Sequence, residues 1–133
     1  MNTMPTVTKE YKETLGKRLK ELRTTYGYTQ TQVSDYLNID QSNYSKIEHG
    51  KRHLKSLSQY QRLSDLYGCT LEYILCEDDN YEPLGITGGK SIDLEIIAQM
   101  NITINYLKML RKIQKLEEIR KHNDNYIDKM EDF

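Results

Sequence analysis

Residues 29–50 of the chain, TQTQVSDYLNIDQSNYSKIEHG, constrain its fold more than any other stretch, because they predict two short helices joined by a sharp turn. Thr29 and Gln32 have the spacing of a capping box, which marks the beginning of the first helix. Asn38 ends that helix, because asparagine tolerates the left-handed backbone conformation that such a turn requires. We predict that the next residue, Ile39, points inward between the two helices.

The second helix, which we call the reading helix, begins after Asp40, a favourable capping residue. Tyr44 and Ile47 lie three residues apart, so they share one face, which we expect to point into the core. The opposite face displays polar side chains of the types that contact DNA bases and phosphates: Gln41, Ser42, Asn43, Ser45 and Lys46. Two helices joined in this way form a helix-turn-helix motif, and the motif predicts DNA binding.

The chain resembles the phage-repressor, Cro and Xre-like family of helix-turn-helix regulators. The resemblance covers about residues 15–75, through LGKRLKELR, TQTQVSDYLNI, SKIEHGKR and LSDLYGCTLEYIL in the order that the family uses. The chain departs from the family pattern where Ser34 replaces the usual alanine and Asn38 the usual glycine. It also has His53-Leu54 after the Gly-Lys-Arg run, where a proline is usual. The resemblance implies an all-α, lambda-repressor-like fold.

The resemblance also implies that the reading helix enters the major groove, which is ~12 Å wide and admits one α-helix. The side chains expected to contact bases are Gln41, Ser42, Asn43, Ser45 and Lys46. Those expected to contact phosphates are Thr29, Gln30, Lys51, Arg52 and Lys55. Gln41 is suited to pair with adenine and Lys46 with guanine. An exposed polar face is often only a solvated surface, but the surrounding motif favours DNA contact here.

A further implication of the resemblance concerns an ion pair. The family commonly joins an arginine that ends the first helix of the domain to a glutamate that ends the reading helix, and these positions are Arg23 and Glu48 here. A partly buried pair of this kind fixes the angle between two helices, and removing one partner is costly. We therefore expect Arg23 and Glu48 to have a structural role.

The flanking sequence predicts three more helices around the motif. The first covers residues 8–26, the fourth residues 56–67, and a short fifth residues 70–75. The apolar face of the fourth is predicted to bury Leu57, Tyr60, Leu63 and Leu66 or Tyr67. Residues 8–76 would then close a five-helix DNA-binding domain. Residues 1–7 are expected to form a flexible tail, and residues 77–90, rich in acidic residues and glycine, a linker.

Residues 91–122 contain no proline or glycine and predict a long C-terminal helix, which Ser91 would cap. Unbroken, it would extend ~45 Å, too far to pack along one small domain. Apolar side chains spaced three or four residues apart predict a helical oligomerisation segment: Ile97, Met100, Ile104, Leu107 and Leu110. A homodimer is favoured, while folding back onto the domain and binding a partner protein are the alternatives. Residues 123–133 are expected to fray.

Charge and cysteine content limit the other functions. The formal net charge is −1, of which residues 1–76 carry +3 and the remainder −4, so the half with the motif is the basic one. Basic residues gather near the reading helix at Lys46, Lys51, Arg52, Lys55 and Arg62. Two cysteines with no signal peptide or long apolar segment indicate a cytoplasmic protein without a membrane partner, in which Cys69 is a buried thiol.

No catalytic or metal-ligand constellation is visible, because the three histidines and two cysteines match no recognised spacing. We therefore expect no enzymatic activity, no metal and no cofactor. The sequence favours a sequence-specific regulator of transcription that binds an operator in double-stranded DNA as a dimeric repressor. The alternative is an antitoxin or immunity-type regulator, whose C-terminal helix would bind a partner protein.

Overall fold

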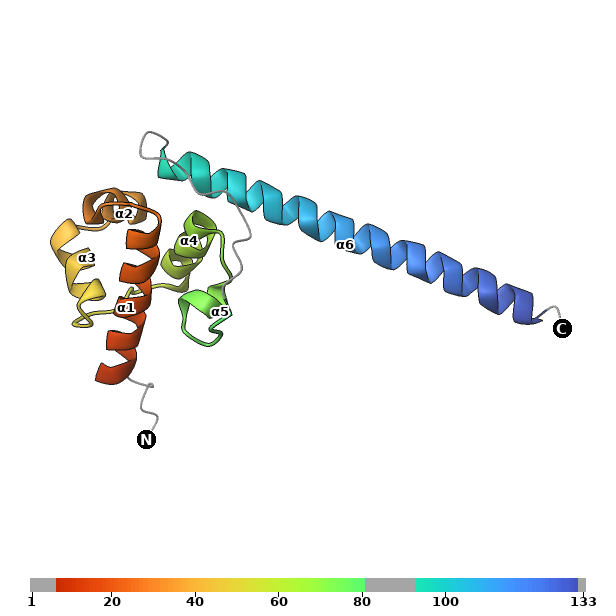
Figure 1. The fold of residues 1–133 in the computed structure, drawn as a ribbon, viewed down its shortest axis with the longest axis horizontal. Helices are drawn as coiled ribbons and strands as arrows, with labels where there is room; N and C mark the ends of the chain where they lie inside the picture. Colours follow the sequence, from red (N-terminus) through yellow and green to blue (C-terminus); the bar gives the residue numbers. More distant parts are fainter. Residues whose placement is uncertain (1–6, 81–92, 132–133) are drawn as a thin grey trace.

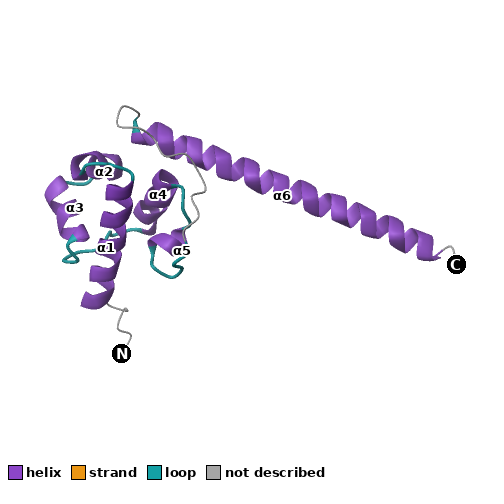
Figure 2. Cartoon of the chain, in the orientation of Figure 1, coloured by secondary structure: helices purple, strands orange, loops and turns teal. Residues whose placement is uncertain are grey.

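Six α-helices account for the secondary structure in the computed structural model, which describes residues 7–80 and 93–131. They are α1 (Lys9–Thr25), α2 (Gln30–Leu37), α3 (Gln41–Glu48), α4 (Leu57–Tyr67), α5 (Leu71–Ile74) and α6 (Leu94–Glu131). The first five form a compact head, from which α6 extends as one straight rod (Figure 1). Helices and loops make up all the described residues, without strands, which confirms the all-α fold (Figure 2).

The turn between α2 and α3 has the predicted geometry. Thr29 Oγ1 accepts a hydrogen bond from the backbone N–H of Gln32 at 3.0 Å, and Gln32 Oε1 accepts one from the backbone N–H of Thr29 at 2.9 Å. These two bonds complete the capping box of α2. Asn38 has φ 57° and ψ 44°, the left-handed conformation that ends the helix. Ile39 packs partly buried against the core, so the local sequence chemistry sets the angle between the two helices.

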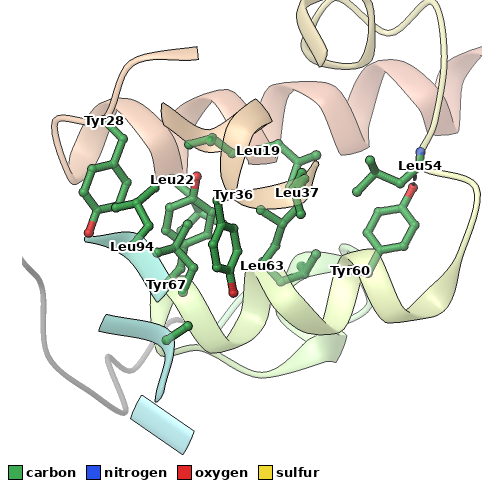
Figure 3. Packing of buried hydrophobic residues seen from close by; sticks show 14 of the residues in the cluster. Leu19, Leu22, Tyr28, Tyr36, Leu37, Leu54, Tyr60, Leu63, Tyr67 and Leu94 are labelled. Atoms are coloured by element: carbon green, nitrogen blue, oxygen red, sulfur yellow. Dashed lines mark hydrogen bonds between the residues drawn. The ribbon is translucent and has the colours of Figure 1, made fainter. Parts of the chain in front are cut away.

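Every helix of the head contributes at least one side chain with no solvent exposure, namely Leu19, Val33, Tyr44, Leu63 and Ile74. Figure 3 shows side chains of α1, α2, α4 and the start of α6 meeting in one cluster. Burial of such side chains from water is the main stabilising contribution to the fold. The reading helix α3 is therefore fixed on the head through its own buried face.

The connection from α3 to α4 corrects one expected core residue. Leu54 is buried, and its backbone N–H donates to the hydroxyl of Tyr60 at 3.1 Å (Figure 3). Leu57, predicted to be buried, is instead 63% exposed. Ser56 caps α4, so Leu57 is its first residue and points to solvent, while Leu54 from the loop fills the core position.

Gly16 allows α1 and α3 to approach closely. A Cβ atom at this position would lie 2.4 Å from the carbonyl oxygen of Ile47 and 2.6 Å from that of Glu48. Both neighbours are backbone atoms of the reading helix, so they cannot move aside without shifting α3. We expect Gly16→Ala to lower the free energy of unfolding by ~1–3 kcal/mol, the usual cost of overpacking.

Urea denaturation of the purified variant measures this effect. Gly27→Ala is the matched control, because Gly27 has φ +76° but a Cβ there meets nothing within 4 Å. The control carries only the backbone strain of a left-handed alanine. A Gly16→Ala variant no less stable than Gly27→Ala would show that the contact with α3 is not tight.

The first turns of α6 belong to the head. Leu94, Ile97 and Ala98 are buried in the common core, where α6 packs against α4 and α2. Asn101 is fully buried, and its Nδ2 donates to the carbonyl oxygens of Asp65 at 2.8 Å and Leu66 at 3.3 Å. The expectation that residues 8–76 complete the domain is therefore corrected, because α6 closes the face that α4 leaves open.

The far end of α6 also differs from the prediction. The helix continues to Glu131, so residues 123–131, expected to fray, are helical. Neither proline nor glycine interrupts this segment, and Arg120 and Asp124 form an ion pair one turn apart at 4.0 Å. The predicted cap Ser91, most of the tail 1–7 and most of the linker 77–90 lie outside the described residues.

Candidate nucleic-acid interface

The Arg23–Glu48 ion pair joins the end of α1 to the end of α3. Arg23 Nε lies 2.7 Å from Glu48 Oε2, and Arg23 Nη2 lies 2.9 Å from Oε1, so the pair is bidentate. The side chains are 13% and 1% exposed, respectively. Arg23 also donates to the carbonyl of Tyr28 at 3.0 Å. The hydrogen bonds to Glu48 raise the pKa of Arg23. The two side chains form the ion pair that the family resemblance implied.

Polar side chains continue from this pair to the surface of the reading helix. Gln30 Nε2 lies 3.4 Å from Glu48 Oε1, and Gln41 Nε2 donates to Gln30 Oε1 at 3.1 Å. Gln41 is exposed at the first position of α3, whereas Gln30 is half-buried at the first position of α2. This chain of contacts holds Gln41 in place through the interior of the domain. The sequence pattern predicted the residues but missed that they form one chain.

The beginning of α3 differs from the predicted cap. Asp40 occupies the capping position, but its side chain makes no capping hydrogen bond. It accepts a hydrogen bond from the hydroxyl of Ser42, which lowers the pKa of the Asp40 carboxyl. Asp40 and Ser42 are therefore engaged with each other at the exposed start of the helix.

The middle of the reading helix carries three more of the predicted base contacts. Asn43 Oδ1 accepts a hydrogen bond from Arg52 Nη1 at 2.7 Å, which joins a predicted base contact to a predicted phosphate contact. Ser45 is half-buried, and its backbone carbonyl lies 2.7 Å from Nδ1 of His49. Lys46 is exposed on the same helix. The predicted reading residues are therefore exposed or half-buried along α3, from Gln41 to Lys46.

Basic side chains surround this surface. Lys51, Arg52 and Lys55 are all exposed in the loop that follows α3. Lys9 and Lys12 of α1, which sequence reasoning missed, line a shallow hollow together with Lys51. Gly50 makes this possible, because its φ of +76° brings the chain against the backbone of Glu13. No local pattern marks these two lysines, since only the folded chain brings α1 beside the loop.

Arg62 does not belong to this basic surface, contrary to the sequence expectation. Its Nη2 donates to the backbone carbonyl of Tyr36 at 2.6 Å and to the carboxylate of Glu95. Its guanidinium also lies over the Tyr36 ring, 4.3 Å from the centroid. These contacts fasten α4 to α2 and to the first turn of α6, so the role of Arg62 is structural.

The predicted oligomerisation residues divide into two groups. Ile97 is 1% exposed in the core of the head, so it is not available to a second chain, and this prediction is wrong. Met100 and Ile104 lie on an open apolar surface of α6, and Leu107 and Leu110 are exposed beyond it. The fold-back alternative therefore holds for the first turns of α6, and the remaining apolar surface is free.

Cys69 is buried, as predicted, and burial raises the pKa of its thiol to about 12. Within residues 7–80 and 93–131, no cluster of His, Cys, Asp and Glu side chains is arranged to hold a metal ion. In the same part of the chain, no helix has both the length and the apolar character needed to cross a membrane.

Comparison with known proteins agrees with this geometry. Residues 19–74 match the model of a protein family described as helix-turn-helix. The chain is 40% identical over 65 residues to the HTH-type transcriptional regulator ImmR of Bacillus subtilis (strain 168), a match that covers 49% of this chain and 50% of ImmR. It is 39% identical over 62 residues to the SPbeta prophage-derived uncharacterized HTH-type transcriptional regulator YonR of the same organism, covering 45% and 55%.

The chain spans about half the length of these curated relatives. No solved structure gives a significant match. The family match covers α2, the left-handed turn at Asn38 and α3, which are the elements that present the polar surface. Residues 19–74 therefore match a helix-turn-helix domain, and their similarity to two HTH-type transcriptional regulators agrees with that match.

Proposed function

We propose that this protein is a sequence-specific DNA-binding regulator of transcription, which inserts α3 into the major groove of an operator. The observation that carries this proposal is the chain of contacts from the buried Arg23–Glu48 pair through Gln30 to Gln41. A surface amide held from the interior is preorganised, so less side-chain entropy is lost when it contacts a base. A polar helix face that only contacts water would gain nothing from contacts that hold its side chains in place.

Base readout is assigned to the exposed face of α3. Gln41 retains hydrogen-bonding capacity beyond its bond to Gln30, and an amide side chain pairs well with adenine. Lys46 is exposed and matches the acceptors of guanine. Ser42, Asn43 and Ser45 complete the set of proposed base contacts.

Phosphate contact is assigned to the residues around that face. Lys51, Arg52 and Lys55 supply charge from the loop, while Thr29 and Gln30 lie at the positive end of α2. Lys9 and Lys12 extend the basic surface along α1. The positive charge of this basic surface would supply much of the affinity for DNA. The side chains of α3 would determine which sequence is preferred.

We further propose that the protein acts as a dimeric repressor at an operator with twofold symmetry. The free apolar surface of α6 supports self-association, because a solvated helix rarely exposes so much apolar area. An antitoxin or immunity-type regulator would use the same surface for a partner protein. Purification of a stoichiometric homodimer favours the repressor, whereas a stable complex with a second protein favours the alternative.

Selection of bound sequences from a random DNA pool tests the proposal, followed by binding measurements on variants. We expect Gln41→Ala and Lys46→Ala each to cost ~1–3 kcal/mol on the selected site and to relax the preference at one base pair. Lys51→Ala should weaken all sequences alike and reduce the dependence of binding on salt, because it leaves the bond between Arg52 and Asn43 in place. Equal losses on selected and random DNA for the α3 variants would reject the readout assignment.

A further inference from the structure

A second apolar stripe runs along α6 beyond the head. From Ile102, steps of four and three residues lead to Tyr106, Met109, Ile113 and Leu116. Arg120 and Asn123 interrupt the stripe, and Ile127 and Met130 resume it. Its apolar members are 40% to 65% exposed. Alternating steps of four and three are the spacing by which two helices wind around each other in a coiled coil.

This stripe differs from the residues that attach α6 to the head. At ~100° per residue, its centre lies about 75° around the helix axis from the buried group Leu94, Ile97, Ala98 and Asn101. A second helix laid on the stripe would therefore approach from the side and would not displace the head. Figure 1 shows that α6 leaves the head behind along most of its length, which leaves room for such a partner.

Charged residues beside the stripe indicate which partner fits and in which direction. Lys112 precedes Ile113 of the stripe, and Glu117 follows Leu116. In a parallel pair of identical helices, Lys112 of each copy lies near Glu117 of the other, so two ion pairs can form. An antiparallel pair with the same overlap would instead bring the two copies of Glu117 together. The charge pattern favours a second copy in the parallel direction.

We propose that two copies of this chain pair through the stripe from Ile102 to Met130 as a parallel, two-stranded coiled coil. The parallel direction places both heads at the same end, one on each side of the rod. Arg120 and Asn123 would fix the register, because polar residues in an apolar seam tolerate few alignments. This inference specifies the dimer on which part of the proposed function rests.

Disulfide crosslinking of the full-length protein without DNA tests the direction. We expect Met109→Cys, on the stripe, to form a covalent dimer in high yield under oxidation. Arg111→Cys, which is exposed on another face of α6, should stay at the level of the wild type, whose own cysteines are buried or half-buried. In an antiparallel pair with full overlap, position 109 of one chain would instead face position 127 of the other. The parallel arrangement would be overturned if Met109→Cys formed no dimer alone and crosslinked only when mixed with Ile127→Cys.

Sedimentation tests the pairing itself. Ile113→Glu should convert the dimer to a monomer, whereas Gln114→Glu, which adds the same charge outside the stripe, should remain dimeric. A monomeric wild-type chain, or equal effects of the two substitutions, would overturn the proposal. These measurements use no DNA, so a dimer that binds no operator would reject the proposed function and leave the coiled coil intact. A DNA-binding monomer would reject the coiled coil and the dimeric part of the proposed function, and would leave DNA binding intact.

Discussion

A Glu48→Ala variant should be less stable than the wild type by ~3–5 kcal/mol, because it leaves the Arg23 guanidinium without its partner. That guanidinium is only 13% exposed, and it would retain the carbonyl of Tyr28 as its hydrogen-bond acceptor. Gln30 would lose the same carboxylate, so the support of Gln41 would also weaken. DNA binding should therefore fall as a consequence of the altered helix angle and the loosened surface.

Denaturant unfolding, with DNA binding measured in parallel, checks this result. Asp124→Ala is the control, because Asp124 pairs with Arg120 on the solvent-exposed end of α6, and such exposed pairs contribute ~1 kcal/mol at most. If Glu48→Ala kept wild-type stability but lost DNA binding, Glu48 would belong to the interface itself, and its assignment as a structural residue would be wrong.

A chain that ends after Asn80 should fold poorly, because it lacks the first turns of α6. Leu94 and Ile97 each contribute roughly 1.5–3 kcal/mol through burial, and their loss would also expose the face of α4 that they cover. The carbonyls of Asp65 and Leu66 would lose the amide of Asn101. A total loss of roughly 3–6 kcal/mol is comparable to the whole stability of many small domains.

A chain that ends after Lys108 is the matched control. It keeps the buried residues of α6 but loses most of the apolar stripe, so it should be folded and monomeric. Circular dichroism with thermal melting distinguishes the two truncated chains. Equal melting temperatures for both would restore the sequence-based expectation that residues 8–76 close the domain alone.

The helix-turn-helix could be predicted from sequence because its determinants are local. The capping box of Thr29 and Gln32 and the left-handed turn at Asn38 depend on side chains close in the chain. Which surface an apolar stripe packs against, by contrast, is not determined by residues close in the chain. Periodicity placed Ile97 on an apolar face of α6, but only the folded structure shows that this face meets α4.

Contacts between residues far apart in the chain also explain why the predictions for Leu57 and Arg62 were wrong and why Lys9 and Lys12 were missed. Leu54 and Leu57 are equally apolar, and the three-dimensional course of the loop decides which of them enters the core. Lys9 and Lys12 join the basic surface only because Gly50 brings the loop against α1. Arg62 is of a residue type that often binds DNA, yet its guanidinium is hydrogen-bonded to the Tyr36 carbonyl and paired with Glu95. Residue type predicted the chemistry of these groups, whereas their neighbours determine their roles.

The position of Gln30 between Glu48 and Gln41 has a consequence for how operator preference can change during evolution or engineering. A new side chain at position 41 alone would leave the Gln30 amide without its surface partner and lose the support from the interior. Successful changes of specificity at position 41 should therefore arrive together with changes at position 30. A library in which both positions vary should yield new specificities as coupled pairs, while a library confined to α3 should mostly yield weaker binders of the original site.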